Sequence, residues 1–360
     1  MSIGAYVIAA GGTGGHVFPG IALAEELHRR RPEAKIVFVG TASGLENKLV
    51  PAAGFELERV SATGFMGKSL SERFGALRRL PRGVGEARKL LKRLEARAVA
   101  GMGGYVSVPV LLAARSLKIP ILIHEPNAHP GLANRLLNRF ASRTAVGFEA
   151  ANEVFKRKGV VTGTPVREPF FAVPPLDPAA PTRRVLVFGG SQGSRVLNGI
   201  VARDAPNLQS LGLEVIHQTG EQEFAAAQKR YYKMPRGFRL LPFLPKMWEE
   251  FAWADLIICR AGALTVAELA AAGRPAILVP LGTSTEGHQL ANARAMAGAK
   301  AAVIMPEAEL ERPNHLAAAV ERLFTDRGTL VKMGESARRL ARPLAAKQLF
   351  DLLLDAEING

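Results

Sequence analysis

His16 is the residue in the first half of the chain with the clearest chemical use, because it lies in a glycine-rich turn. The run GGTGGHVFPG spans residues 11–20 and follows residues 5–10, an apolar stretch short enough to be a buried strand. A helical pattern of apolar residues begins at Ile21, and Pro19 suits the first turn of that helix. Such a strand-to-helix turn exposes backbone N–H groups that attract anions. The pattern predicts an anion cradle presenting one imidazole, with a plain tight turn as the alternative.

The spacing of these glycines excludes two common nucleotide motifs. No G-x-G-x-x-G can be threaded through residues 11–20, and no G-K-[ST] follows them. The dinucleotide fingerprint and the P-loop are therefore both missing from this turn.

Two later loops add polar side chains that could act together with the imidazole. Tyr105 follows the glycine pair Gly103 and Gly104, while Glu125 and Asn127 follow another short apolar run. In a parallel sheet, ligands bind beyond the carboxyl ends of the strands. We therefore expect these loops to converge on one crevice.

A second strand–turn–helix pattern, residues 255–275, carries Glu268 one turn into its helix. The helix is predicted to begin near Leu264, where free N–H groups and the hydroxyl of Thr265 could hold a diphosphate. The carboxylate of Glu268 could accept two hydrogen bonds from a ribose diol. Alternatively, this carboxylate only complements the helix dipole.

Residues 280–293 read as a polar loop that leads into another helix, and they include His288 and Gln289. These two side chains could bind sugar hydroxyls. A role in starting the helix is the alternative.

The elements that must position these residues form two similar series. Short apolar runs alternate with helical patterns over residues 1–163, and the same alternation restarts over 183–343. Such alternation predicts α/β domains with doubly wound, parallel sheets of the Rossmann type. Residues 164–182 contain six prolines and are predicted to be an interdomain linker. The C-terminal residues 344–360 are predicted to form a helix that packs back on the first domain.

Composition limits the possible function classes. The 360 residues are 48% hydrophobic and carry a net charge of +15, which indicates folded domains and an anionic partner. The single cysteine, Cys259, excludes an intramolecular disulfide and a cysteine-rich metal site. We find no basic leader followed by an apolar run, and no stretch of about 18 apolar residues.

The segment of residues 64–97 combines ten Lys and Arg residues with Phe, Met and Leu. A basic face beside exposed apolar side chains suits an anionic bilayer surface. An ordinary helix with a solvated basic face and a core-facing apolar stripe is the alternative. Nucleic acid is not expected as a partner, because zinc spacing and an RNP-type aromatic motif are both missing and only 6% of residues are aromatic.

Seven motifs in order along the chain resemble the MurG family of bacterial N-acetylglucosaminyltransferases. They are GGTGGHVFPG (11–20), GMGGYVS (101–107), HEPN (124–127), GTPVR (163–167), GGSQG (189–193), CRAGALTVAELAAAG (259–273) and HQLANA (288–293).

The resemblance implies a glycosyltransferase of the B-type fold, with two domains facing across a cleft. It implies an inverting, metal-independent transferase without a cofactor. The substrates would be UDP-N-acetylglucosamine and undecaprenyl-diphosphate-linked N-acetylmuramyl-pentapeptide, in peptidoglycan synthesis. It also implies peripheral attachment to the cytoplasmic face of the inner membrane.

The resemblance also implies roles for individual residues. The donor would be bound by Arg167, Ser191, Leu244, Ala263, Leu264, Thr265, Val266, Ala267, Glu268, His288 and Gln289. The first domain would complete the donor pocket with Thr13, Gly14, Gly15 and Asn127. Because residues 264–268 already account for the donor diphosphate, the glycines around His16 are expected to face the acceptor's diphosphate instead. The catalytic candidates are His16, as general base, with Glu125 and Asn127. The acceptor side would hold Gly103, Gly104 and Tyr105.

Two other function classes stay open at this point. One is another two-domain enzyme of UDP-N-acetylglucosamine, such as an epimerase. The other is a basic module that binds membranes or nucleic acid without catalysis.

Overall fold

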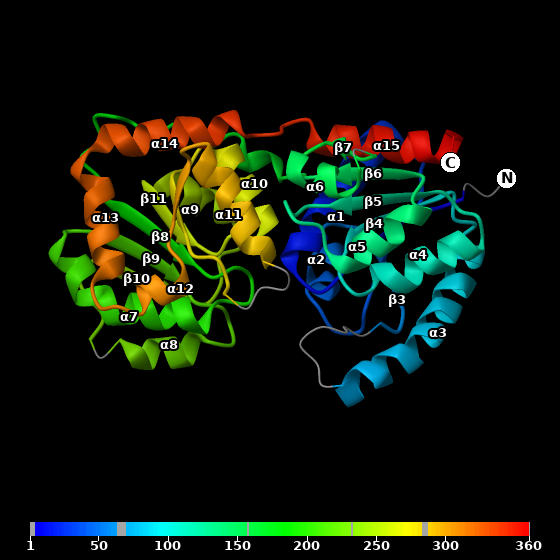
Figure 1. Ribbon diagram of the computed structural model, residues 1–360, viewed down its shortest axis with the longest axis horizontal. Helices are drawn as coiled ribbons and strands as arrows, with labels where there is room; N and C mark the ends of the chain where they lie inside the picture. Colours follow the sequence, from blue (N-terminus) through cyan, green and yellow to red (C-terminus); the bar gives the residue numbers. More distant parts are fainter. Residues whose placement is uncertain (1–3, 63–69, 157, 232, 283–286, 360) are drawn as a thin grey trace. The chain divides into compact units, whose positions relative to one another are not determined.

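The computed structural model describes residues 4–62, 70–156, 158–231, 233–282 and 287–359, and for residues 70–79 only the backbone. The chain divides into two compact units (Figure 1). The first comprises residues 1–166 and 343–360, and the second comprises residues 167–342.

The first unit has a parallel sheet of seven strands within the described residues. In spatial order these are β3 (Glu56–Arg59), β2 (Ile36–Gly40), β1 (Tyr6–Ala10), β4 (Ala98–Gly103), β5 (Ile121–Glu125), β6 (Arg143–Val146) and β7 (Val160–Val161). Its helices are α1 (Gly14–Arg30), α2 (Glu46–Ala52), α3 (Leu70–Arg93), α4 (Ser107–Ser116), α5 (Leu132–Leu137), η1 (Asn138–Phe140), α6 (Glu149–Val154) and α15 (Ala345–Asn359).

Both faces of this sheet are covered, which is why its central strands read as continuous apolar runs. Side chains alternate across the sheet, so Val7 belongs to the core beneath α3 and α4. Tyr6 and Ile8 point to the opposite face, where α1 and α15 pack. Figure 1 shows α15, in red, lying along this unit, and its Leu349 and Leu353 are buried in the same core.

Helix α3 changes the interpretation of the basic segment. Leu90, Leu91 and Leu94 are buried in the core of the first unit, so our expectation that they are exposed beside the basic face was wrong. They form one apolar stripe, because Leu94 lies three residues after Leu91 and four after Leu90, and residues three and four apart are neighbours on a helix surface. The expected exposed apolar residues Phe65 and Met66 lie outside the described residues.

The opposite face of α3 and its C-terminal extension is basic and exposed. Its exposed residues are Arg82, Arg88, Lys89, Lys92, Arg93 and Arg97. We refer to these six residues as the basic face. None of the described helices is long and apolar enough to cross a bilayer.

The second unit repeats the architecture with a six-stranded parallel sheet in its described part. Its spatial order is β10 (Phe238–Leu241), β9 (Glu214–Gln218), β8 (Arg184–Phe188), β11 (Leu256–Cys259), β12 (Ala276–Leu278) and β13 (Ala302–Ile304). Its helices are η2 (Glu168–Phe170), α7 (Arg195–Ser210), α8 (Phe224–Arg230), α9 (Met247–Trp253), α10 (Ala263–Ala272), α11 (His288–Gly298), α12 (Glu307–Leu310), α13 (His315–Thr325) and α14 (Arg327–Arg339). The predicted fold class, two doubly wound α/β domains, is confirmed.

The proline-rich segment belongs largely to the second unit. Residues 167–182, which the sequence assigned to an interdomain linker, pack against that unit. Phe170 is fully buried and meets Phe251 edge-on, with ring centroids 5.1 Å apart. Leu176 joins the apolar core of the same unit. The prolines keep the segment extended, and the apolar residues between them pack into the core of the second unit.

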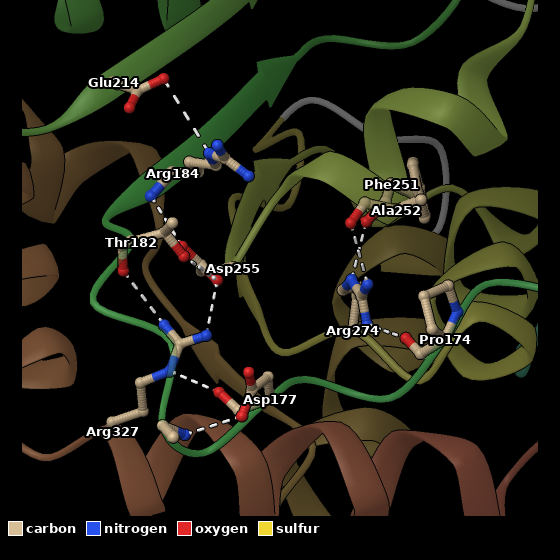
Figure 2. Close-up of polar contacts among 11 residues, drawn as sticks. Pro174, Asp177, Thr182, Arg184, Glu214, Phe251, Ala252, Asp255, Arg274 and Arg327 are labelled. Atoms are coloured by element: carbon tan, nitrogen blue, oxygen red, sulfur yellow. Dashed lines mark hydrogen bonds and ion pairs between the residues drawn. The ribbon is translucent and has the colours of Figure 1, made fainter.

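Arg274 is the largest fully buried side chain of the described residues, and it fastens the proline-rich segment at its middle. Its guanidinium donates to the carbonyl oxygens of Pro174 at 2.9 Å, Phe251 at 2.7 Å and Ala252 at 3.2 Å (Figure 2). Burial lowers the pKa of this guanidinium to about 10. The cation therefore remains protonated and bridges α9 to the segment.

Arg327, at the start of α14, fastens the end of the proline-rich segment. It donates to the carbonyl oxygens of Asp177 at 2.9 Å and Thr182 at 3.1 Å, and it pairs with the buried carboxylate of Asp255 at 2.9 Å. The other oxygen of Asp255 accepts from the backbone N–H of Arg184 at 2.9 Å, so strand β8 is tied to the same network (Figure 2).

Candidate active site

The first unit presents His16 at the start of α1, beyond the carboxyl end of β1. Its Nδ1 lies 3.1 Å from the carbonyl oxygen of Met102. Because a carbonyl can only accept, this contact requires the hydrogen of the neutral imidazole on Nδ1. The lone pair is then on Nε2, which is the arrangement a general base needs.

The imidazole of His16 fits only because Gly103, at the end of β4, has no side chain. A Cβ atom at Gly103 would lie 2.7 Å from Cε1 of His16 and would collide with Nδ1. Gly103 also has a φ of +104°, which a side chain strongly disfavours. Gly104 approaches the first turn as closely, because its Cβ would collide with the carbonyl oxygen of Gly11. Two of the predicted loops thus meet at His16, while Tyr105 beside them is 52% exposed.

Burial lowers the pKa of His16 below 6.5, because the imidazolium form is poorly solvated there. The nearby carboxylates of Glu125 and Glu46 act in the opposite direction. The net effect keeps His16 neutral at pH 7.

Glu125 ends strand β5 and is buried, with four N–H donors on its carboxylate. Oε1 accepts from the backbone N–H and the side-chain amide of Asn127, at 2.9 and 3.0 Å. Oε2 accepts from the N–H of Gly131 at 3.0 Å and the amide of Asn134 at 2.9 Å. This geometry supports a positioning role, because both oxygens are engaged in holding the loop that presents Asn127.

The second unit places Glu268 in α10, buried behind the start of that helix. Its Oε1 lies 3.3 Å from Nη2 of Arg167. Burial raises the pKa of this carboxyl to about 7, and the guanidinium only partly opposes the shift. The guanidinium of Arg167 also stacks on Phe170 and Trp248, with centroid distances of 5.2 and 5.0 Å.

Helix α10 begins after Gly262 and has no acidic residue in its first turn. Leu264, Thr265 and Ala267 are partly exposed, whereas Ala263 and Val266 are buried and anchor the helix. The first N–H groups of a helix have no intrahelical acceptor. The exposed side of this helix end can therefore hold an anion.

Two contacts tie neighbouring loops to the turn before α10. Buried Arg260 donates to Oγ of Ser194 at 2.6 Å and pairs with Glu307, which links it to the loop that holds Ser191. The amide of Asn292, in α11, donates to the carbonyl oxygen of Ala261 at 3.1 Å. Sequence reasoning did not select Arg260 or Asn292, although both stand inside recognised motifs.

The remaining donor candidates have mixed exposure. Ser191 is partly exposed in the glycine loop after β8, and Leu244 is buried after β10. His288 and Gln289 begin α11 and are partly exposed, and Oε1 of Gln289 accepts from the N–H of Leu281 at 3.0 Å. That bond occupies the amide oxygen of Gln289 and leaves its NH₂ group as the donor for a ligand.

Each unit thus gathers its own set of candidates beyond the carboxyl ends of its strands. Thr13, Gly14 and Gly15 stand beside His16 at the start of α1 in the first unit. Among the residues that the structure describes, no group of three or more His, Cys, Asp or Glu side chains is placed to hold a metal ion.

The two units correspond to two known glycosyltransferase domains. Residues 6–146 match the glycosyltransferase family 28 N-terminal domain, and residues 184–349 match the glycosyltransferase family 28 C-terminal domain. The chain therefore belongs to glycosyltransferase family 28.

Particular relatives within this class are similar over nearly their whole length. A protein of Methylococcus capsulatus, named UDP-N-acetylglucosamine–N-acetylmuramyl-(pentapeptide) pyrophosphoryl-undecaprenol N-acetylglucosamine transferase, is 42% identical over 349 residues, 97% of this chain and 98% of the relative. A protein of the same name from Stutzerimonas stutzeri is 42% identical over 352 residues, covering 97% and 98%. The crystal structure of MurG from Acinetobacter baumannii has 34% identity and a TM-score of 0.75, covering 98% of this chain and 99% of that one. The expectation of a glycosyltransferase is confirmed.

Proposed function

We propose that this chain transfers N-acetylglucosamine from UDP-N-acetylglucosamine to the 4-hydroxyl of undecaprenyl-diphosphate-linked N-acetylmuramyl-pentapeptide. The observation that carries the proposal is the 42% identity, over 97% of the chain, to a relative named for this reaction. The product is the lipid-linked disaccharide of peptidoglycan synthesis.

In this mechanism, Nε2 of His16 accepts the proton of the 4-hydroxyl while the hydroxyl oxygen bonds to the anomeric carbon of the donor. The bond from that carbon to the diphosphate oxygen breaks, and UDP leaves with the electron pair. Attack from the opposite face converts the α-linked donor into a β1→4 product. General-base assistance contributes about 10²–10⁴-fold to such a step.

The donor is assigned to the second unit. The N–H groups at Leu264 and Thr265 stabilise the leaving diphosphate, with the nearby charge of Arg167, and no metal ion is required. Glu268 accepts the hydrogen bonds of the ribose diol. Backbone groups near Leu244 bind uracil, while Ser191, His288 and Gln289 contact the diphosphate and the sugar.

The acceptor is assigned to the first unit. The N–H groups of Gly14 and Gly15 hold the acceptor diphosphate, while Gly103, Gly104 and Tyr105 line its path. Glu125 and Asn127 position the loop beside the imidazole. Transfer requires that these groups and the donor groups meet during turnover.

The basic face is assigned to the anionic membrane that carries the acceptor, on the cytoplasmic side. Each Lys or Arg near such a surface contributes about 1 kcal/mol. Arg82, Arg93 and Arg97 already pair with carboxylates of the first unit, so Arg88, Lys89 and Lys92 are assigned the larger share of the attraction. This attraction supports peripheral binding without apolar insertion by the described leucines.

The decisive experiment measures transfer of labelled N-acetylglucosamine to the lipid-linked muramyl-peptide, with and without a chelator. We expect transfer at the same rate in both. Conversion of the UDP-sugar without acceptor would instead indicate an epimerase, and loss of transfer on chelation would contradict the metal-independent step. A protein that binds vesicles but shows neither transfer nor thermal stabilisation by UDP-N-acetylglucosamine would be a binding module.

The membrane proposal has its own test by vesicle flotation. Replacing Arg88, Lys89, Lys92 and Arg93 with Gln should abolish binding to anionic vesicles. The control replaces four exposed cations of the second unit, Lys229, Lys233, Arg236 and Lys300, and should retain binding. Equal losses of vesicle binding in the two variants would show that binding depends only on the net charge of the protein. Binding to RNA instead of vesicles would contradict the assignment of the basic face to the membrane.

A further inference from the structure

Glu46 is a fully buried carboxylate in the first unit, and sequence reasoning gave it no role. It begins α2, and its side chain reaches the turn that presents His16. Oε2 accepts from the backbone N–H of Gly12 at 2.8 Å, and Oε1 accepts from the backbone N–H of Thr41 at 3.0 Å. The hydroxyl oxygen of Thr41 lies 2.8 Å from the same Oε1. The carboxylate thus joins the end of β2 to the first glycine turn.

The surroundings of Glu46 are shaped to its side chain. A Cβ atom at Gly11 would lie 2.9 Å from its Oε1, and one at Gly40 would lie 2.5 Å from its Cγ. A Cβ at Gly44 would lie 2.7 Å from its Cδ and would collide with Oε2. Three glycines, one at the end of β2 and two in the loops after β1 and β2, therefore leave room for one carboxylate.

This contact changes which donors of the turn are available. The N–H of Gly12, which we expected to help to cradle an anion, already donates to an anion that the protein supplies. The N–H groups of His16 and Val17 donate to the carbonyl oxygen of Thr13, both at 3.2 Å. Gly14 and Gly15 are the first residues of α1, where N–H groups have no intrahelical acceptor.

We propose that Glu46 is a positioning residue for the acceptor: its carboxylate is the resident anion of the turn at Gly12 and fixes the donors that follow. This inference rests on the proposed transfer reaction. The carboxylate of Glu46 holds Gly12 on one side of the turn, and Gly11 packs against Gly104 on the other. The backbone of the turn is therefore fixed in one conformation. That conformation directs the free N–H groups of Gly14 and Gly15 toward the acceptor diphosphate. It also holds the imidazole of His16 at a fixed position relative to the bound acceptor.

The first test is Glu46→Gln. A carboxamide keeps the volume but replaces one oxygen with NH₂, which must face either the N–H of Gly12 or the N–H of Thr41. We expect kcat/KM for the lipid-linked acceptor to fall at least tenfold, through both a higher KM and a lower kcat. The affinity for UDP, which binds the other unit, should stay within twofold of wild type.

The matched control is Glu357→Gln in the same unit. Glu357 is also largely buried, accepts from the hydroxyl of Tyr6 at 2.6 Å and pairs with Arg31 and Arg97, but it lies at the amino end of β1. We expect this variant to lose stability without a change in the KM for the acceptor. Similar acceptor kinetics in the two variants would overturn the proposal, because they would reduce Glu46 to a general contributor to stability.

A second variant keeps the test valid if Glu46→Gln does not fold. Gly44→Ala retains the charge and pushes the carboxylate off Gly12, so it should reproduce the same loss on the acceptor side. Acceptor kinetics within twofold of wild type in Gly44→Ala would overturn the proposal. A wild-type protein that binds UDP but transfers nothing would instead refute the transferase function itself, which the wild-type assay reveals before any variant is compared.

Discussion

Nη2 of Arg167 and Oε1 of Glu268 lie 3.3 Å apart, although 101 positions separate the two residues in the chain. The pair joins the start of the proline-rich segment to the helix assigned to the donor. It also leaves the carboxyl of Glu268 with a pKa of about 7, since burial outweighs the attraction of the guanidinium. A group that titrates near neutral pH makes ligand binding measurably dependent on pH.

Uridine binding should strengthen as pH rises from 6 to 8. The ionised carboxylate accepts both hydrogen bonds of the ribose diol, and a group with a pKa of about 7 goes from mostly protonated to mostly ionised over this range. We expect affinity to increase roughly fivefold to tenfold by calorimetry. Uridine is the probe because it has no phosphate to titrate.

Two variants check the assignment of this titration. Glu268→Gln should bind uridine weakly and without the pH dependence. Arg167→Gln should shift the midpoint upward, because the guanidinium lowers the pKa of Glu268. A pH dependence that persists in Glu268→Gln would assign it to another group and return Glu268 to a role in the helix dipole.

Gly103→Ala should reduce transfer by more than tenfold without weakening UDP binding. The new Cβ collides with the imidazole of His16, which must turn away from the carbonyl of Met102. Steady-state kinetics and UDP calorimetry provide the measurement. The control is Gly54→Ala, in the same unit, where φ is +82° but a Cβ meets nothing within 4 Å. Equal loss of transfer in the two variants would attribute the effect to backbone strain.

His16→Gln should lower kcat by about 10²–10⁴-fold with little change in UDP affinity. The pKa of His16 lies below 6.5, so wild-type kcat should be level above pH 7 and fall as acid protonates Nε2. That acid limb should vanish in the variant. Full turnover by His16→Gln would make the residue only part of the turn.

Acid should destabilise the first unit more than the second. His124 is buried in the first unit with a pKa of about 4, and His217 in the second with a pKa of about 3. Both unfolded-state values are near 6.5, so each histidine contributes stability above pH 6.5 that is lost as pH falls, by about 2 kcal/mol at pH 5. In the second unit the titration of Glu268 offsets part of this loss of stability. Its pKa is higher in the folded state, so protonation of Glu268 stabilises the fold as pH falls from 7 toward 4.5.

Hydrogen exchange at pH-corrected rates, followed by mass spectrometry, separates the two units. Amides of β5 should lose protection between pH 6.5 and 5, whereas amides of β9 should change less. The reverse order would show that these buried groups do not control the acid response.

Arg274→Met should lower the free energy of unfolding of the second unit by about 2–4 kcal/mol. The substitution leaves the carbonyl oxygens of Pro174, Phe251 and Ala252 without their donor, and all three bonds are lost together. Urea unfolding followed by tryptophan fluorescence reports on this unit, because both tryptophans of the chain, Trp248 and Trp253, lie in it. An unchanged midpoint, like that expected for the exposed Lys229→Met, would contradict the role of Arg274.

Most of the fold could be predicted from the sequence because its central strands are buried on both faces. Residues 5–10 and 185–188 read as continuous apolar runs for this reason. The partly exposed edge strand β3 and the short strand β6 were missed, since neither carries a comparable run. The proline-rich segment was interpreted from its composition alone, and composition does not reveal that Phe170 is a core residue.

The candidate site, like the fold, could be predicted from the sequence only in part. His16 and Glu268 could be selected because each stands at a fixed offset from a strand–turn–helix pattern. The four donors that surround Glu125 come from the loop after β5 and from Asn134 in α5, and no local pattern specifies the path that brings them together. Glu46 was missed because its significance depends on three glycines and on Gly12, and only the folded chain brings these together.

The placement of α15 has a consequence for synthesis of the protein. The first unit is discontinuous, because residues 167–342 are inserted before its last helix. Leu349, Phe350 and Leu353 complete a core whose other members lie in the first 145 residues. A ribosome therefore makes the whole second unit before the first can close one face of its sheet. Until then the apolar surface of α1 and of strands β4 to β6, on which α15 packs in the folded protein, stays uncovered in the nascent chain.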